Sequence, residues 1–376
     1  MRKILISMLI LMPLALFSQK MDFEAYDPPS TLVVPEHIVT RAKFPFIDVH
    51  NHQWEMPTQD LGELIPEMDK LNMAVMVNLS GRGFTRVQNP DGSYSYSVRG
   101  GDFLKGAVEN VKAHYPNRFI VFTNINFEGI GKPGWTEQAV KQLEIDVKNG
   151  ANGLKIYKGL GMFTKDAAGK RVPTDDSRLD PIWQKCGELG IPVLIHTGDP
   201  APFWQPFDST NERWLELKQR PGRKRDPATE PSWEQIMNEQ FNVFRKHPQT
   251  IFISAHLAWL GNNLARLGEL LDEMPNMYTE IGAVIAELGR QPRFAHDWFI
   301  KYQDRVLFGK DVWAPSEYHV YFRCLETNDD YFKYYRRRHA FWRIYGLNLP
   351  DEVLKKLYYK NALTIIPGID KSLFPE

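Results

Sequence analysis

The stretch Phe46-Ile47-Asp48-Val49-His50-Asn51-His52 is an apolar run that ends in two histidines one residue apart. Residues i and i+2 of a β-strand point to the same face, so the imidazoles of His50 and His52 converge at the end of this strand. Two imidazoles with an acidic residue nearby suit a divalent metal ion that takes nitrogen and oxygen ligands. Two surface histidines at a strand end have the same pattern, and the rest of the chain must decide between these interpretations.

Seven further short apolar runs follow this stretch, with amphipathic helical patterns between them. The expected strands are residues 46–50, 73–79, 119–124, 153–157, 192–196, 251–256, 277–281 and 306–309. Eight apolar strands that alternate with helices predict an α/β fold, and eight is the number that closes a (β/α)8 TIM barrel. An open doubly wound sheet is the alternative, but no glycine-rich nucleotide-binding motif follows any of these strands.

The first 43 residues are expected to lie outside the barrel. A basic start at Arg2 and Lys3, an apolar run and a small residue at Ser18 are typical of a signal peptide over residues 1–18. Cleavage near Ser18 predicts an exported protein, periplasmic or secreted, with no membrane contact afterwards; an uncleaved anchor is the alternative. Residues 19–43 are proline-rich and predict an irregular N-terminal arm. Residues 44–376 then form one barrel domain.

Composition points to a small-molecule partner. The 376 residues are 43% hydrophobic, and 46 Lys and Arg residues balance 46 Asp and Glu residues. Without a basic stripe or an acidic tail, nucleic acid is not an expected partner. A homo-oligomer is left open. Cys186 and Cys324 fall in different predicted helices with no C-x-x-C spacing, so both are expected to be buried and unpaired.

Two segments exceed what a minimal barrel needs. Residues 198–232, after the fifth strand, hold six prolines, two tryptophans and the basic run 223–225. A long loop with this aromatic content predicts an ordered lid. Residues 331–345 are aromatic and basic, with three arginines at 336–338. They predict a solvated helix face, with contact to a substrate anion as the alternative.

Polar residues cluster where the predicted strands end, which is where TIM barrels carry their chemistry. Taken singly, a histidine there can be a buried side chain bonded to a carbonyl, an aspartate can cap a helix, and a lysine can pair with a carboxylate. Together they indicate one site. Its strand-end members are His50, His52, Lys155, His196, His256 and Asp311.

With these residues in this order, the chain resembles the amidohydrolase superfamily of metal-dependent barrels. The closest resemblance is to the amidohydrolase-2 branch, which includes aminocarboxymuconate-semialdehyde decarboxylase. The resemblance runs from about residue 46 to residue 366. One departure is Lys310, where the family usually has a small residue. The matching motifs are Asp48-x-His50-x-His52, Gly153-Leu154-Lys155, Leu194-Ile195-His196-Thr197, Ala255-His256, Val306-Leu307-Phe308-Gly309-Lys310-Asp311 and Lys360-Asn361-Ala362-Leu363.

This resemblance implies a ligand set and an acid–base pair. One divalent metal ion, with Zn²⁺ expected, would be held by a set of four ligands. His256 and Asp311 would act as acid and base, and Asp48 would support a ligating histidine. Lys155 would contact substrate or, if carboxylated, bridge two metal ions. The four metal ligands implied are His50, His52, His196 and Asp311.

Further side chains are predicted to contact a substrate, with an anion as one expected class. They are Arg82, in a glycine-rich loop after the second strand, together with Trp54, Lys310 and Trp313. The expected reaction is hydrolysis of a small amide, lactone or ester by metal-bound hydroxide. The alternative is non-oxidative decarboxylation of an aromatic or unsaturated carboxylic acid. The third interpretation, a non-catalytic binding protein, predicts a missing ligand, and none is missing.

Overall fold

The computed structural model describes residues 21–88, 94–339 and 342–375, so the predicted signal peptide lies outside the described residues. The chain divides into two units, Met1–Val33 and Val34–Glu376. In the first, the described residues form a short 3-10 turn, Phe23–Ala25. The second unit begins at Val34, inside the segment predicted as an arm. Its first residues are tied to it, since Ala42 N donates to Leu71 O at 3.1 Å.

All eight predicted strands are present, with the third interrupted at Phe122. Each pairs in parallel with its neighbours, in the orders β1-β2-β5 and β6-β7-β8-β9-β10-β11. The strands are β1 (Phe46–Asn51), β2 (Met73–Asn78), β5 (Phe119–Val121), β6 (Thr123–Asn124), β7 (Leu154–Ile156), β8 (Val193–Ile195), β9 (Phe252–Ser254), β10 (Met277–Glu280) and β11 (Val306–Leu307).

Backbone hydrogen bonds close the two sheets into one ring. Val49 N donates to Phe308 O at 3.0 Å, which joins the last strand to the first. On the other side, the chain runs through Phe122 from β5 to β6. The ring of Phe122 lies against Gly153, where a Cβ would stand only 2.4 Å away, so that position requires glycine. The protein is a TIM barrel, as the strand count predicts.

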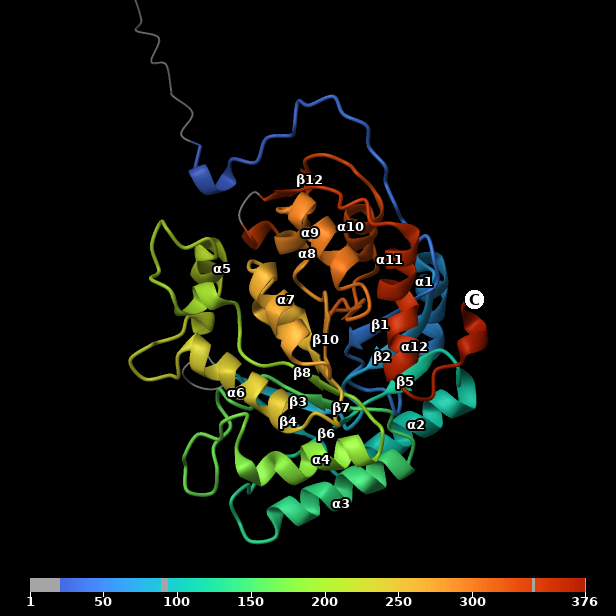
Figure 1. Ribbon diagram of the computed structural model, residues 1–376, viewed down its shortest axis with the longest axis vertical. Coiled ribbons are helices and arrows are strands. Elements are labelled where there is room, and N and C mark those ends of the chain that lie inside the picture. Colours follow the sequence, from blue (N-terminus) through green and yellow to red (C-terminus); the bar gives the residue numbers. More distant parts are fainter. Residues whose placement is uncertain (1–20, 89–93, 340–341, 376) are drawn as a thin grey trace, which may run out of the picture. The chain divides into compact units, whose positions relative to one another are not determined.

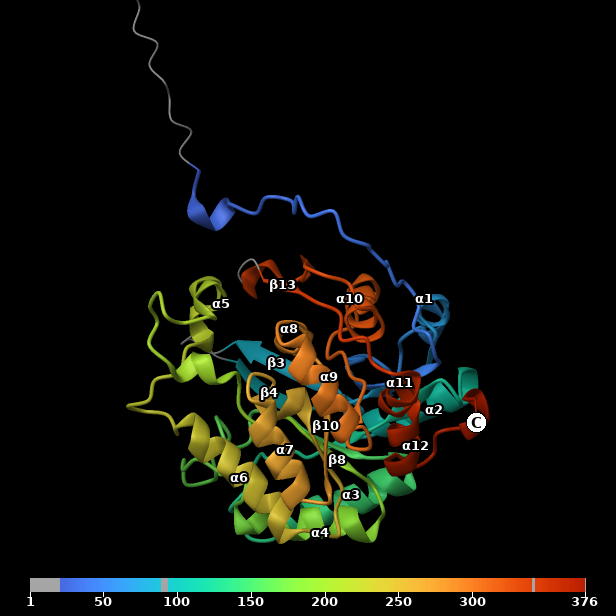
Figure 2. The same cartoon turned by 45° about the horizontal axis from the view of Figure 1, so that its top comes forward.

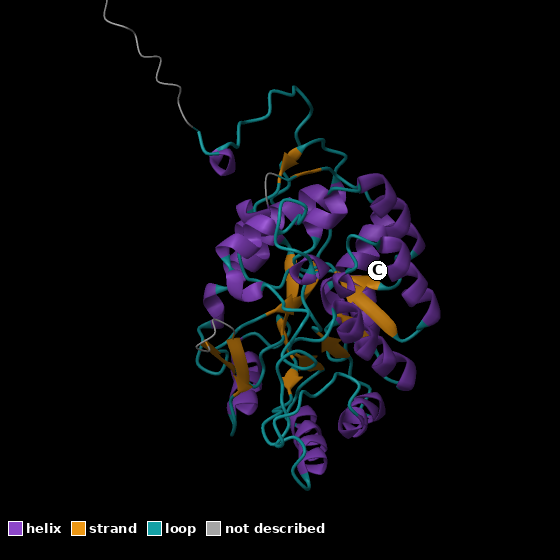
Figure 3. Ribbon diagram, turned by 90° about the vertical axis from the view of Figure 1, so that its left-hand side faces the viewer, coloured by secondary structure: helices purple, strands orange, loops and turns teal. Residues whose placement is uncertain are grey.

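Helices surround the strands, and their apolar faces are buried against them (Figures 1 and 3). In α7 the buried Leu264, Leu267 and Leu271 follow a helical period, and the side chain of Asn263 caps the first turn. No helix of the described residues is long and apolar enough to cross a membrane. The main helices are α1 (Ile65–Leu71), α2 (Phe103–His114), α3 (Trp135–Lys148), α4 (Asp180–Glu188), α6 (Trp233–Lys246), α7 (Leu264–Glu273), α9 (Pro292–Lys301), α10 (Pro315–Glu326), α11 (Asp351–Lys355) and α12 (Asn361–Ile365).

Three additions follow barrel strands. An antiparallel hairpin, β3 (Phe84–Gln88) with β4 (Tyr94–Val98), follows β2 and was not predicted. The loop after β8 contains α5 (Trp214–Gln219), so it is ordered as expected. Residues 331–345 differ from the predicted helix face, because β12 (Phe332–Lys333) pairs with β13 (Arg343–Ile344). In Figure 2, α5, α8 (Ile285–Gly289) and β13 lie above the strands and α3 and α4 below them.

The two cysteines are buried and free, which confirms the expectation that they do not form a disulfide. Burial raises the pKa of each thiol above its ordinary range, so both stay protonated at neutral pH.

Candidate metal centre

His50 of β1 and His52, just after that strand, face Asp311, which follows β11. His50 Nδ1 lies 2.9 Å from Glu280 Oε1, and His50 Nε2 lies 3.4 Å from Asp311 Oδ1. His52 Nδ1 lies 2.8 Å from Ser80 Oγ, and its Nε2 lies 3.9 Å from the same Asp311 oxygen. Each imidazole is therefore held through Nδ1 and turns Nε2 toward one carboxylate. His50, His52 and Asp311 have ligand atoms within 4.8 Å of one another.

The backbone at Asp311 turns its carboxylate back toward β1. Its φ is 81°, in the left-handed region that few residues other than glycine adopt, and its N–H donates to His50 O at 2.7 Å. Burial opposes ionisation of this carboxyl, but His50, His256 and His52 outweigh it and hold the pKa well below its usual range. Asp311 is thus an anion at neutral pH.

The histidines of the centre are neutral at pH 7. Burial is the main cause, and it lowers the pKa of His50 to about 3 and that of His256 to about 4. Burial also holds the pKa of His52 and His196 well below the ordinary value. A neutral imidazole has a free lone pair, which is the form that binds a metal ion. The donor set therefore fits a divalent cation.

Glu280, which ends β10, is a buried member of the centre that sequence reasoning missed. Its Oε1 accepts from His256 N at 2.7 Å and contacts His50 Nδ1, and its Oε2 accepts from Gly282 N. With His50 and His256 it forms a second group that could hold a cation. Because its oxygens already accept these hydrogen bonds, we assign Glu280 to support of the two imidazoles. The sequence signal that could have identified Glu280 was its position near the end of a predicted strand, where the other residues of the site lie.

His256 lies in an unusual turn after β9. The four residues from His256 to Trp259 have φ between 52° and 59°, a left-handed turn that stacks the rings of its first and last residues at 4.4 Å. His256 Nδ1 lies 2.7 Å from Gly282 O, a distance at which it donates to that carbonyl. The opposite atom, Nε2, is buried and has no hydrogen-bond partner within the described part of the chain.

His196, after β8, lies beside this turn and belongs to neither group of three. Its ring is 4.5 Å from that of His256, and its Nε2 is also buried without a partner among the residues described. Buried polar atoms ordinarily have partners, so two orphaned imidazole nitrogens mark where a ligand would bind.

Lys155, on β7, reaches the same centre from inside the barrel. It is buried, and its Nζ lies 3.5 Å from His50 Nε2. Burial lowers the pKa of Lys155, and it raises the pKa of the neighbouring Glu280. The lysine is thus adjacent to the predicted ligands, as the resemblance implies.

Two predicted substrate contacts point elsewhere. Arg82 is buried, and its Nη1 donates to Asp146 Oδ2 on α3 at 3.4 Å. The ammonium of Lys310 donates to Glu317 Oε2 and to Val312 O. Each cation already has an anionic partner, and contact of either with a substrate stays a prediction. Sequence position alone did not reveal which way these long side chains extend.

The remaining predicted residues divide between the site and its support. Trp54 is 41% exposed, and its ring stacks on that of His52 at 5.2 Å. Trp313 packs on Tyr318 with the ring centroids 5.8 Å apart. Asp48 accepts from the backbone N–H groups of His50 and Lys310, so it joins the ends of β1 and β11 rather than an imidazole. Burial raises the pKa of Asp48 to about 6.

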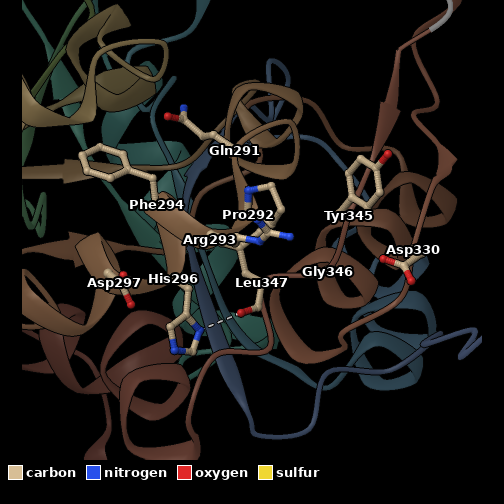
Figure 4. A pocket seen from close by; sticks show the side chains of 10 residues that line it. All are labelled: Gln291, Pro292, Arg293, Phe294, His296, Asp297, Asp330, Tyr345, Gly346 and Leu347. Atoms are coloured by element: carbon tan, nitrogen blue, oxygen red, sulfur yellow. Dashed lines mark hydrogen bonds between the residues drawn. The ribbon is translucent and has the colours of Figure 1, made fainter.

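A separate hollow of about 830 Å³ lies at the start of α9 (Figure 4). Arg293 and Phe294 line it from the helix, and Tyr345 lines it from the segment after β13. None of the predicted site residues lines this hollow.

Comparison with known proteins places this barrel in a family. A family model described as amidohydrolase matches residues 47–367. The chain belongs to that family. The amidohydrolase barrel is also similar to solved structures, as two examples show. No curated protein matches the chain significantly.

The first example is an uncharacterised TIM-barrel protein from Bordetella bronchiseptica. It is 16% identical with a TM-score of 0.51, and the match covers 86% of this chain and 99% of that one. The second is dihydroxybenzoic acid decarboxylase from Polaromonas sp. JS666, solved with bound manganese and the inhibitor 2-nitroresorcinol. It is 14% identical with a TM-score of 0.53, covering 88% of this chain and 99% of that one. At these identities the likeness shows the fold.

Proposed function

We propose that this protein is a divalent-metal-dependent enzyme that decarboxylates a small aromatic or unsaturated carboxylic acid without oxidation. The observation that carries the proposal is the convergence of His50, His52 and Asp311 on one point, next to the unpartnered Nε2 atoms of His196 and His256. These residues lie at the carboxyl end of the strands, where TIM barrels place their active sites.

The metal ion would be held by His50, His52 and Asp311, with His196 as the fourth ligand expected from the resemblance. A divalent cation there would polarise a substrate oxygen or lower the pKa of water from about 15.7 toward 7. We propose one ion per chain. Zinc, expected from the sequence, and manganese, which the Polaromonas decarboxylase holds, are the two metals to test first.

His256 would move the proton. In a decarboxylation the bond to the carboxylate carbon breaks, and the electron pair left on the substrate carbon takes a proton. The Nδ1 atom of His256 is held by Gly282 O, so its neutral imidazole presents Nε2 as a proton acceptor. A proton that Nε2 takes from solvent water would be delivered to the substrate carbon as CO₂ leaves. Glu280 fixes the backbone of His256 in this position.

Hydrolysis of an amide, lactone or ester is the second candidate. The observation that favours it is the anionic Asp311 carboxylate, which is 28% exposed and so accessible to the proton of an attacking water. Family membership is compatible with both reactions. We place decarboxylation first because the Polaromonas protein, which shares the fold, is a decarboxylase. A non-catalytic role would predict that a residue of the set is absent, whereas all are present.

The two reactions are separated by their products. We expect metal-loaded protein incubated with hydroxybenzoates to release CO₂, and chelator-treated protein to release none. His50→Ala and Asp311→Ala should lose both bound metal and turnover. Lactone opening with no CO₂ from any acid would reverse the order of the two candidates. Full metal retention by both variants would contradict the ligand assignment.

We further propose that the protein is exported through residues 1–18. The support is the basic start and short apolar run of this segment. N-terminal sequencing of the mature protein should find a start near residue 19, and a mature protein that starts at Met1 would contradict cleavage.

A further inference from the structure

We propose that Arg336 binds a carboxylate of the substrate at the rim of the metal centre. This inference deepens the proposed function and rests on it. Arg336 belongs to residues 331–345, the segment between α10 and α11. For this segment the sequence favoured a solvated helix face, with contact to a substrate anion as the alternative.

Packing contacts hold this segment against the ends of β10 and β11. Lys310 Nζ, one residue before Asp311, lies 5.4 Å from the ring centroid of Tyr335. The ring of Tyr335 is 6.5 Å from that of Tyr321, whose hydroxyl accepts from Ala283 N at 2.9 Å, three residues after Glu280. Tyr335 therefore contacts residues that follow both strands, and Arg336 is the next residue along the chain.

The guanidinium of Arg336 is partly buried and has no ion pair or hydrogen bond to the described residues. The guanidinium lies beside the ring of Tyr335, with Cζ 5.5 Å from the centroid. Neighbouring basic groups have partners: Arg213 donates to Glu216 and Glu287, and Arg338 Nε lies 3.7 Å from Glu216. A cation removed from water is costly unless an anion compensates it. Arg336 thus forms no direct ion pair among the described residues, unlike Arg213 and Arg338.

Asp311 is the carboxylate whose charge acts on this guanidinium. Burial would lower the pKa of Arg336, but the oxygens of nearby tyrosines and Asp311 raise it above the usual range. No ion pair joins Arg336 to Asp311 among the described residues, so the guanidinium keeps its donors for another anion.

Two further donors lie next to Arg336. The hydroxyls of Tyr334 and Tyr335 are buried and lack partners among the residues that the structure describes, and Tyr334 is only 7% exposed. Burial raises the pKa of the Tyr334 phenol well above its ordinary value, so it remains a donor. A planar guanidinium with phenol O–H groups beside it suits the two oxygens of a carboxylate.

Stacked aromatic rings on the same centre favour a planar carboxylic acid. The rings of His52 and Trp54 are 5.2 Å apart, and those of Phe84 and Tyr157 are 3.9 Å apart. Such a wall accepts a flat ring by stacking. The substrate class assigned here is a small aromatic or conjugated acid whose carboxylate contacts Arg336.

The test compares benzoate with benzamide, its neutral isostere, by calorimetric titration of chelator-treated and metal-loaded protein. We expect wild type to prefer benzoate by at least about tenfold, as expected for a charge-assisted contact. Arg336→Gln should lose about tenfold in benzoate affinity, in both metal states, with benzamide unchanged. Arg336→Lys should recover part of the loss. Arg343→Gln, on β13 of the same segment, removes the same charge and should bind like wild type.

Binding does not require turnover, so the inference and the proposed function fail separately. If Arg336→Gln binds benzoate within twofold of wild type, the carboxylate contact is wrong, whatever the reaction. If benzoate preference depends on Arg336 but no acid is decarboxylated, the proposed function is wrong and the contact stands. If the protein decarboxylates an acid, Arg336→Gln should raise KM for that acid more than it lowers kcat.

Discussion

Glu280 shows how one buried carboxylate supports several parts of the centre. It contacts His50 Nδ1 and accepts from the backbone of His256, so His50 keeps its Nε2 lone pair turned toward Asp311. Groups that hold a ligating imidazole commonly change metal affinity by about 10–100-fold when altered. We expect Glu280→Gln to weaken metal binding by about tenfold, measured by competition with a chelator.

The control for this variant is Glu273→Gln, a change of the same kind in a half-exposed carboxylate that pairs with Arg245. It should bind metal like wild type. Equal metal affinity in Glu280→Gln and wild type would show that Glu280 does not support the ligands.

His256 offers a test that separates proton transfer from metal binding. Its Nε2 is buried without a described partner, and its Nδ1 is held by Gly282 O. General acid–base groups typically contribute about 10²–10⁴-fold to rate. We expect His256→Gln to lower kcat by that order while metal content stays unchanged. His296→Gln, whose native Nδ1 is hydrogen-bonded to Leu347 O away from the centre, should keep full activity. Loss of metal from His256→Gln would make His256 a ligand instead.

The direction of long side chains is what sequence reasoning could not supply. His50 and His52 were paired because alternate residues of a strand point to the same face, and Asp311 was added from its position after the last strand and from the family resemblance. Arg82 and Lys310 were assigned to substrate from position alone, yet their flexible stems reach Asp146 and Glu317. The nearest carboxylate in space decides where such a cation lies, and the chain order does not reveal it.

At the scale of elements, the loop after β8 depends on Asp199. Its carboxylate accepts from Lys158 Nζ at 2.8 Å and from Arg225 Nη2 at 2.7 Å, which joins the loop to residues after β7. Removing one partner of a buried ion pair leaves the other uncompensated and costs about 3–5 kcal/mol. We expect Asp199→Asn to lower the free energy of unfolding by about 3 kcal/mol, since Lys158 is partly exposed. Denaturant titration measures it, with exposed Asp208→Asn as the control.

The same ion pair predicts a pH dependence. Burial would raise the pKa of Asp199, but Lys158 and Arg225 hold it below its ordinary value. A carboxyl whose pKa falls on folding stabilises the protein above its unfolded pKa, about 3.9, and loses that effect as pH falls through the folded pKa. The stability difference between wild type and Asp199→Asn should be full at pH 7 and shrink below about pH 4. A difference independent of pH would contradict the charge-based account.

The strands and helices could be predicted from sequence where apolar runs alternate regularly with helical patterns along the chain. The eight apolar runs are barrel strands because parallel strands buried on both faces need continuous apolar sequence. The β3–β4 hairpin has no such burial pattern, and residues 331–345 pair as β12 and β13 although their basic residues suggested a helix. Those short pairings depend on tertiary contacts, which local sequence does not record.

At the scale of the whole molecule, the barrel assembles a site from residues more than 250 positions apart in sequence. His50 lies on the first barrel strand, and Asp311 comes after the last. The hydrogen bond from Val49 N to Phe308 O joins these two strands and so brings the two residues together. Sequence order and strand count sufficed to predict this convergence. Glu280 escaped prediction, and for Arg336 contact with a substrate anion was only the alternative, because such roles depend on which partners a side chain has, or lacks, in three dimensions.

Metal binding should be detectable in the stability of the whole molecule. A ligand that binds only the folded state stabilises it by RT ln(1 + [L]/Kd), about 2.7 kcal/mol when free metal is 100 times Kd. Removing metal also leaves the buried Nε2 atom of His196, the proposed fourth ligand, without a partner. We therefore expect chelation to lower the melting temperature by a few degrees, and added Zn²⁺ or Mn²⁺ to restore it. Asp311→Ala should melt at one temperature with or without metal, because it lacks the carboxylate ligand. A metal-dependent shift of equal size in that variant would place the ion elsewhere, with the group formed by His50, His256 and Glu280 as the next site to test.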